Sequence, residues 1–157
     1  MSDVYSHWSA SPMTFSRDHQ YKFERDYFKP NGLWFDVDAD WKRWCEGESF
    51  RVDGFAFRHI IELENDGILR LEDARDIDAF TRKYGRQPEQ SYRSIEIDWK
   101  HLRSQFRGIV IAPYCWERRM TEHTMWYYSW DCASGCVWDL TAVKSVECVP
   151  QSQEVSQ

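Results

Sequence analysis

The sequence predicts an α+β fold, in which strands come in runs and helices stand between them. Aromatic and β-branched segments near both ends of the chain are typical of strands, whereas central segments carry apolar side chains at helical spacing. Strands and helices do not alternate regularly, so a parallel βαβ sheet is not expected. The 157 residues suit one domain over residues 1–149, followed by a flexible polar tail over residues 150–157.

The first elements are strands followed by a helix. We expect a strand over residues 3–10 and a long loop over residues 13–31, where no periodicity is present. The turn signal "KPNG" introduces a second strand, "GLWFDV", over residues 32–37. Asp38 is positioned to cap a helix over residues 39–48, whose predicted buried face carries Trp41, Trp44 and Cys45.

The next elements are a predicted hairpin and a helix. Strands over residues 54–64 and 68–72 flank Asp66-Gly67, a turn signal that predicts their pairing as a β-hairpin. Asp73 is the expected cap of a helix that ends at Gly85. The apolar side chains of this helix recur at helical spacing and are Ile77, Phe80 and Tyr84.

The last part of the chain predicts a helix over residues 97–106 and an apolar strand over residues 107–114. Two further strands are expected over residues 125–130 and 135–143, with a bend over residues 131–134 between them.

Composition restricts the function classes. Aromatic residues make up 17% of the chain and include 9 tryptophans, so we expect some rings to line a pocket as well as the core. A net charge of −6 disfavours binding to nucleic acid, which requires neutralisation of phosphates. The mean hydropathy is −0.72, no apolar run is long enough to span a bilayer, and the N-terminus lacks signal-peptide features. The expected location is the cytoplasm, without membrane association.

The cysteines predict reduced thiols. Their number is 5, an odd number without a secretion signal. Cys132 and Cys136 are four residues apart, and His123 could add a third metal ligand. Structural zinc sites favour paired Cys-x-x-Cys elements, which are absent here. We therefore expect both cysteines to pack as small apolar residues, and we expect no metal site.

Common catalytic signatures, such as a Walker loop, GxGxxG, GxSxG or HExxH, are absent. Three segments instead occur in a characteristic order: "HWSAS", "GLWFDVDADWKRWC" and "SGCVWDLTAV", which begin at residues 7, 32 and 134. This order resembles the histidine–tyrosine–glutamate branch of the ADP-ribosyltransferase superfamily. The resemblance covers residues 4–146. It places Trp34 at the tyrosine position and Trp44 near a later aromatic, whereas Trp8 replaces a small residue and Ser134 replaces the glutamate.

The resemblance implies a fold of two small, mostly antiparallel sheets that form a cleft with a few flanking helices. It also implies an NAD⁺-dependent transferase that cleaves the nicotinamide–ribose bond and modifies a macromolecule. The acidic net charge favours a protein over a nucleic acid as the acceptor. His7 would bind a ribose hydroxyl, and the backbone of Trp8 would pair with the carboxamide. The residues that the resemblance assigns to the cofactor are His7, Trp8, Ser9, Trp34, Phe35 and Trp44.

The catalytic positions implied by the resemblance are His7, Ser134 and a carboxylate. Ser134 has no negative charge, so Asp131 in the preceding bend is the expected replacement. Two carboxylates in the loop before it, Glu117 and Glu122, are alternatives. Arg118 or Arg119 could contact a pyrophosphate.

Alternative interpretations remain open. Without its glutamate, the domain could bind a nucleotide or a partner protein without catalysis, for example as an inhibitor of a host protein. Small acidic cytoplasmic proteins of this size are common among phage and mobile-element products. The residues also admit structural roles: His7 bonded to a carbonyl, Trp41 and Trp44 in packing, and Asp131 bonded to backbone N–H groups. In that case the resemblance is accidental.

Overall fold

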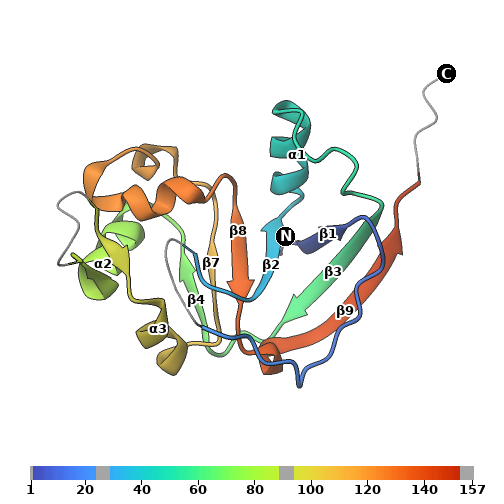
Figure 1. The fold of residues 1–157 in the computed structure, drawn as a ribbon, viewed down its shortest axis with the longest axis horizontal. Helices are drawn as coiled ribbons and strands as arrows, with labels where there is room; N and C mark the ends of the chain where they lie inside the picture. Colours follow the sequence, from blue (N-terminus) through green and yellow to red (C-terminus); the bar gives the residue numbers. More distant parts are fainter. Residues whose placement is uncertain (1, 24–28, 89–93, 153–157) are drawn as a thin grey trace.

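The computed structural model describes residues 2–23, 29–88 and 94–152. Its main element is a seven-stranded sheet in the order β4-β7-β8-β2-β1-β3-β9, and β5 and β6 form a separate two-stranded ribbon. Helices α2 and α3 lie beside the β4–β8 half of the sheet, whereas α1 stands at the end of β2 (Figure 1). The α+β class is therefore confirmed.

The strands and helices have the following bounds. The large sheet contains β1 (Tyr5–Ser9), β2 (Leu33–Val37), β3 (Phe57–Leu63), β4 (Ile68–Leu71), β7 (Gly108–Ile111), β8 (Ser134–Val137) and β9 (Val143–Pro150). The ribbon contains β5 (Gly85–Arg86) and β6 (Glu96–Ile97). The α-helices are α1 (Asp40–Gly47), α2 (Ala74–Tyr84) and α3 (Trp99–Gln105), and the 3-10 segments are η1 (Trp116–Arg118), η2 (Glu122–Ser129) and η3 (Leu140–Ala142).

The two central strands are joined by a short ladder. β1 pairs with β3 along all five of its residues, but with β2 only through Tyr5↔Val37 and Ser6↔Asp36. Beyond Ser6, β2 instead continues its pairing with β8. The fold thus differs from the expected pair of sheets, because this ladder joins the two halves into one sheet. A pocket lies where this ladder stops.

The hairpin expected at Asp66-Gly67 is wrong. β3 pairs with β1 and β9, whereas β4 lies at the other end of the sheet and pairs in parallel with β7. Gly67 does form a turn, with φ of 77°, but its carbonyl accepts a hydrogen bond from the Arg107 N–H that precedes β7. The Asp-Gly signal identifies a turn and does not specify the partner of the strand that follows.

The strand expected over residues 125–130 is also wrong, because most of this segment belongs to η2. Trp126 and Tyr127 are both buried in η2, and Trp130 follows them. All three rings pack in the core cluster that contains residues of α2 and α3. The segment was predicted as a strand because aromatic residues are common in strands, but here the rings pack against helices. The last predicted strand, over residues 135–143, is interrupted: β8 ends at Val137, and Asp139 caps η3 before β9 begins.

Helix capping is partly as expected. Asp73 accepts a hydrogen bond from the Asp76 N–H at 2.9 Å, and α2 ends before Gly85, as predicted. Asp38 does not cap α1, since its carboxylate accepts the Val4 N–H at 2.9 Å. A different aspartate, Asp36, accepts the N–H of Trp41 in the first turn at 3.1 Å.

Two apolar clusters stabilise the two faces of the sheet. Leu33, Phe35 and Val37 of β2 belong to one cluster, against which residues from the segment 13–21 pack. Trp34 projects to the opposite face and packs against the cluster of α2 and α3, as the two-residue period of a strand requires. β2 is thereby fixed on both faces.

The described C-terminal residues continue the sheet. Pro150 is the last residue of β9, and the Gln151 N–H donates to the Ala56 carbonyl at 2.8 Å. Residues 153–157 of the expected tail lie outside the described residues. None of the helices in the described ranges combines the length and the apolar character that crossing a membrane requires.

Candidate functional site

A pocket of about 300 Å³ lies where β1 and β2 part, and we call it the β1–β2 pocket. Segments far apart in the sequence form its wall: β1, β2, the start of β8 and the bend before it. Six of the eight predicted site residues line it: His7, Trp8, Trp34, Phe35, Asp131 and Ser134.

The other two predicted residues lie outside the wall. Ser9 is half-buried, and its hydroxyl donates to the Ser11 carbonyl at 2.5 Å in a local turn. Trp44 stacks on Trp41, with ring centroids 5.1 Å apart and ring planes 7° apart. Trp41 itself lines the pocket, so Trp44 contacts a wall residue without lining the pocket.

His7 has one ring nitrogen bonded to the protein. Its Nδ1 lies 2.7 Å from the Trp34 carbonyl oxygen and donates to it, across the place where the β1–β2 ladder stops. Burial lowers the pKa of His7, which favours the neutral ring. In a neutral imidazole with the proton on Nδ1, Nε2 is an acceptor. Among the described residues Nε2 has no hydrogen-bond partner, so it is available to a ligand.

His59, the neighbour of His7 on β3, has a contrasting environment. It is fully buried, its Nδ1 pairs with the His7 carbonyl at 3.0 Å, and its Nε2 accepts the Met13 N–H at 3.0 Å. Both nitrogens of His59 are satisfied by the backbone. His59 is therefore a structural histidine, whereas His7 is satisfied at one nitrogen only.

Trp8 has a polar role that sequence reasoning missed. Its indole Nε1 donates to the Asp36 carboxylate at 2.8 Å. The guanidinium of Arg58 and the ammonium of Lys42 lie 5.1 Å and 5.5 Å from the ring centroid, within the range of cation–π contacts. The ring is held by these contacts and orients the carboxylate.

Asp36 is a wall residue with a titratable side chain that sequence reasoning did not identify. The residue is 2% exposed, Oδ2 accepts from the Trp8 indole and from the Trp41 N–H, and Oδ1 is buried and has no partner in the part of the chain that the structure describes. Burial raises the pKa of Asp36 to about 6. The available signal was a carboxylate inside an otherwise apolar strand, since carboxylates are seldom buried without a partner or a function.

Trp34 presents a half-buried ring to the pocket. Its edge contacts Trp130, with centroids 4.9 Å apart, and its Nε1 donates to the Pro30 carbonyl at 3.2 Å. The ammonium of Lys29, another wall residue, lies 5.1 Å from the ring centroid. Phe35 contributes less to the pocket, because it is 3% exposed and packs on Tyr5 in the core.

Asp131 and Ser134 reach the pocket with their polar groups already engaged. The Asp131 carboxylate forms an ion pair with Arg119 at 3.3 Å, and the Ser134 hydroxyl donates to the Cys132 carbonyl at 3.0 Å. Arg119 also lies 6.0 Å or less from the rings of Tyr114, Trp116 and Tyr128. The carboxylate predicted from the resemblance is therefore partly neutralised.

The cysteines near the pocket are buried thiols. Cys132 and Cys136 are 5% and 0% exposed, and burial raises the pKa of each well above that of a free thiol. Cys136 packs within β8, as expected for a small apolar residue. Among the described residues, no group of three or more His, Cys, Asp or Glu is arranged to hold a metal ion.

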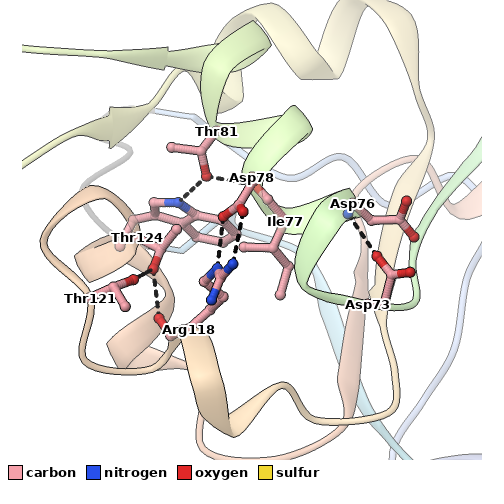
Figure 2. Close-up of polar contacts among 9 residues, drawn as sticks. Asp73, Asp76, Ile77, Asp78, Thr81, Arg118, Thr121 and Thr124 are labelled. Carbon is pink, nitrogen blue, oxygen red and sulfur yellow. Dashed lines mark hydrogen bonds and ion pairs between the residues drawn. The ribbon is translucent and has the colours of Figure 1, made fainter.

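A second hollow, of about 480 Å³, lies between α2 and the 3-10 segments, and we call it the α2 hollow. The Arg118 guanidinium donates two hydrogen bonds to the Asp78 carboxylate, at 2.8 Å and 2.9 Å (Figure 2). Thr124 donates to the Arg118 carbonyl, and Thr81 donates to the Ile77 carbonyl, at 2.7 Å in each case. The polar groups at the centre of this hollow are therefore paired within the protein.

The alternative residues considered above lie away from the β1–β2 pocket. His123 and Arg118 line the α2 hollow, so His123 does not share a pocket with Cys132. Glu117 and Glu122 are exposed and line neither cavity. Arg119 reaches the pocket only through Asp131.

No protein-family model matches this chain, and no curated protein or solved structure matches it either.

Proposed function

We propose that the protein is an NAD⁺-dependent ADP-ribosyltransferase and that the β1–β2 pocket binds the nicotinamide–ribose half of NAD⁺. The observation that carries this proposal is the convergence of His7, Trp34, Asp131 and Ser134 on one pocket, from three segments separated by most of the chain. A volume of about 300 Å³ is at the lower end for ligand pockets and suits one half of a dinucleotide.

The free groups of the pocket match the parts of this ligand. Nε2 of His7 is an acceptor for a ribose hydroxyl, and the half-buried indole of Trp34 offers an apolar wall for the flat nicotinamide ring. Lys29 and Arg51 also line the pocket and are exposed, so they are placed to meet the pyrophosphate.

In the reaction, the bond between nicotinamide and ribose C1′ breaks, and its electron pair leaves with nicotinamide. Positive charge develops on the ribose ring until a nucleophile of the acceptor bonds to C1′ and loses its proton to a base or to water. The pocket must hold the ribose and stabilise this charge, which an anionic side chain does in a site screened from water. We propose a protein acceptor, because the net charge of −6 disfavours nucleic acid.

The test is incubation of the protein with NAD⁺ labelled in the adenylate part, together with a cell lysate, while free nicotinamide is measured. Wild type should transfer label to protein and release nicotinamide, and His7→Ala should do neither at a comparable rate. Asp131→Ala tests the carboxylate that the resemblance implies. Absence of both label transfer and nicotinamide release with the wild type would end the catalytic proposal.

A second candidate function is binding without turnover, for example by an inhibitor of a host protein, a role known for phage products. The observation that favours it is the ion pair between Arg119 and Asp131, which reduces the negative charge available at that carboxylate. On this alternative, NAD⁺ would raise the melting temperature by mass action and would not be consumed. If saturating NAD⁺ left the melting temperature unchanged, a protein partner would become the leading interpretation.

A further inference from the structure

The pocket contains a second carboxylate, and its position relates to both departures from the family pattern. Asp36 lies directly opposite Ser134 in the β2–β8 ladder. Paired residues of an antiparallel ladder project to the same face, with Cβ atoms about 4.5–5.5 Å apart. A carboxylate at Asp36 therefore occupies the neighbourhood that a side chain at Ser134 would reach from the next strand.

A serine at position 134 is consistent with a carboxylate at Asp36 on the opposite strand. Like charges directly opposite each other in a sheet are destabilising, and burial would increase that cost. With Asp36 at 2% exposure, a glutamate at position 134 would place a second buried carboxylate beside it. Ser134 avoids this conflict and satisfies its own hydroxyl on the Cys132 carbonyl.

Trp8, the other departure from the family pattern, is also consistent with a carboxylate at Asp36. Trp8 stands where the family pattern has a small residue, and its Nε1 donates to Oδ2 of Asp36. The Trp41 N–H donates to the same oxygen, which leaves Oδ1 buried without a partner. The carboxylate is thus fixed through one oxygen, while the other makes no hydrogen bond to the protein.

We propose that Asp36, rather than Asp131, is the catalytic carboxylate of this pocket, and that its negative charge at the pocket wall stabilises the positive charge that develops on the ribose. This inference rests on the proposed function. Asp131 differs from Asp36 in that its carboxylate forms an ion pair with Arg119 and in that 26% of its side chain is exposed. A pKa of about 6 keeps Asp36 mainly ionised at neutral pH, as the role requires.

A structural role alone would also use Asp36, because it bonds the first turn of α1. That role needs an acceptor at Oδ2 and no charge, so Asp36→Asn should preserve it if the amide oxygen occupies the same place. The variant therefore separates the charge of Asp36 from its contribution to the fold. Its melting temperature reports whether the fold is kept.

The experiment measures nicotinamide release from NAD⁺ between pH 5 and pH 8 for the wild type, Asp36→Asn, Asp131→Asn and the matched variant Asp38→Asn, whose aspartate is exposed and lies outside the pocket wall. We expect Asp36→Asn to be about 100-fold slower, as for loss of one charge-stabilising group, Asp131→Asn to lose less than Asp36→Asn, and Asp38→Asn to stay within a few-fold of wild type. The wild-type rate should rise with pH as Asp36 and His7 lose their protons, and Asp36→Asn should keep only the part of this rise that is due to His7. A larger loss in Asp131→Asn than in Asp36→Asn, or an unchanged rate for Asp36→Asn, would overturn the proposal.

A rescue variant gives a second, independent readout. In the double variant Asp36→Asn/Ser134→Glu, a carboxylate returns from the opposite strand, and the rate should recover at least tenfold over Asp36→Asn. Ser134→Glu alone should lower the melting temperature, because it opposes two buried carboxylates. If the double variant folds but is no faster than Asp36→Asn, a carboxylate at this place is not what the reaction needs.

Failure of the proposed function is distinguishable from failure of this inference. A wild type that neither releases nicotinamide nor gains melting temperature with NAD⁺ would overturn both. A wild type that binds NAD⁺ without releasing nicotinamide would end catalysis, and the role of the Asp36 charge would then be judged by affinity for the positively charged nicotinamide ring. Asp36→Asn should weaken NAD⁺ binding at pH 7.5 about tenfold relative to Asp131→Asn, and equal affinities would overturn that role.

Discussion

The α2 hollow is larger than the β1–β2 pocket, about 480 Å³ against 300 Å³, yet the two differ most in how their polar groups are satisfied. In the α2 hollow, the buried hydroxyls of Thr81 and Thr124 and the Asp78–Arg118 pair are bonded within the protein. In the β1–β2 pocket, one oxygen of Asp36 has no partner among the described residues. Buried polar groups normally have partners, so this unpaired oxygen distinguishes the β1–β2 pocket from the α2 hollow more clearly than volume does.

Two other buried polar atoms without partners sharpen this comparison. The indole Nε1 atoms of Trp99 and Trp130 are also unpaired, but both rings lie in the apolar core and line neither cavity. Asp36 differs from both tryptophans because its unpaired atom belongs to a charged group and because the residue lines a cavity.

The largest expected effect contrasts two histidines, one in each cavity. His7→Ala should slow nicotinamide release about 100-fold, because the acceptor for the ribose hydroxyl is lost. His123→Ala, an exposed residue of the α2 hollow, is the matched control and should stay within a few-fold of wild type. Melting temperatures establish that both variants are folded. Equal losses in the two variants would remove the functional difference between the cavities.

The next effect is a pH dependence of stability at Asp36. Burial raises its pKa to about 6 from 3.8, so the folded state binds this proton more tightly than the unfolded state does. The stabilisation is complete below about pH 4 and is lost as pH rises through 6, an effect of roughly 3 kcal/mol. Urea unfolding at pH 4.5 and pH 7.5 should show that Asp36→Asn lacks this loss.

His7 contributes with the opposite sign. Burial lowers its pKa below 6.5, so the unfolded state takes up its proton first, and stability is lost as pH falls below 6.5. His7→Gln provides the control that separates the two contributions in the same unfolding series. If the wild type and Asp36→Asn shared one pH profile, Asp36 would not be the strained carboxylate that the pocket requires.

A smaller effect tests whether the α2 hollow is structural. Thr81→Val removes the acceptor for the Trp126 Nε1–H, a contact of 3.0 Å between buried groups. Leaving that donor unsatisfied should lower the free energy of unfolding by about 1–3 kcal/mol, and Thr81→Ser should restore most of it. NAD⁺ affinity, measured in parallel, should be unchanged. A weakened affinity in a folded Thr81→Val protein would assign ligand binding to the wrong cavity.

The smallest effect concerns the ion pair of the α2 hollow. The Arg118 guanidinium holds the pKa of Asp78 below its ordinary value, so this pair stabilises the fold above that value and loses its effect as pH falls through the lowered pKa. About a third of the Asp78 side chain is exposed, so solvent screens the pair and Arg118→Ala should lower the free energy of unfolding only slightly at neutral pH. Equal unfolding curves for wild type and Arg118→Ala at pH 7 would show that the pair contributes nothing.

The sequence predicted the convergence of the site better than the paths of the strands. His7 and Trp34 lie in the first two motifs and Asp131 lies just before the third, and all three line one pocket. The partner of β4 could not be predicted in this way. Local turn chemistry at Asp66-Gly67 says that the chain turns, whereas pairing with β7 depends on burial of apolar side chains far away in the sequence.

The run "FDVDAD" explains why the central carboxylate was missed. Its three aspartates alternate along the chain and look equivalent, but they serve different backbone donors: Asp36 that of Trp41, Asp38 that of Val4, and Asp40 that of Ala133. Which one reaches the pocket depends on the register of β2 against β8. Register is a tertiary property, and one residue of slip would turn the other face of the strand to the pocket.

The most direct test of the account is titration calorimetry of NAD⁺ into the wild type, Trp34→Ala and Thr81→Val. Because the ring of Trp34 lies at the β1–β2 pocket and Thr81 at the α2 hollow, each variant alters one cavity. We predict binding at one site, weakened at least tenfold by Trp34→Ala and unchanged by Thr81→Val. No measurable binding to the wild type, or a loss of affinity caused by Thr81→Val and not by Trp34→Ala, would contradict the account.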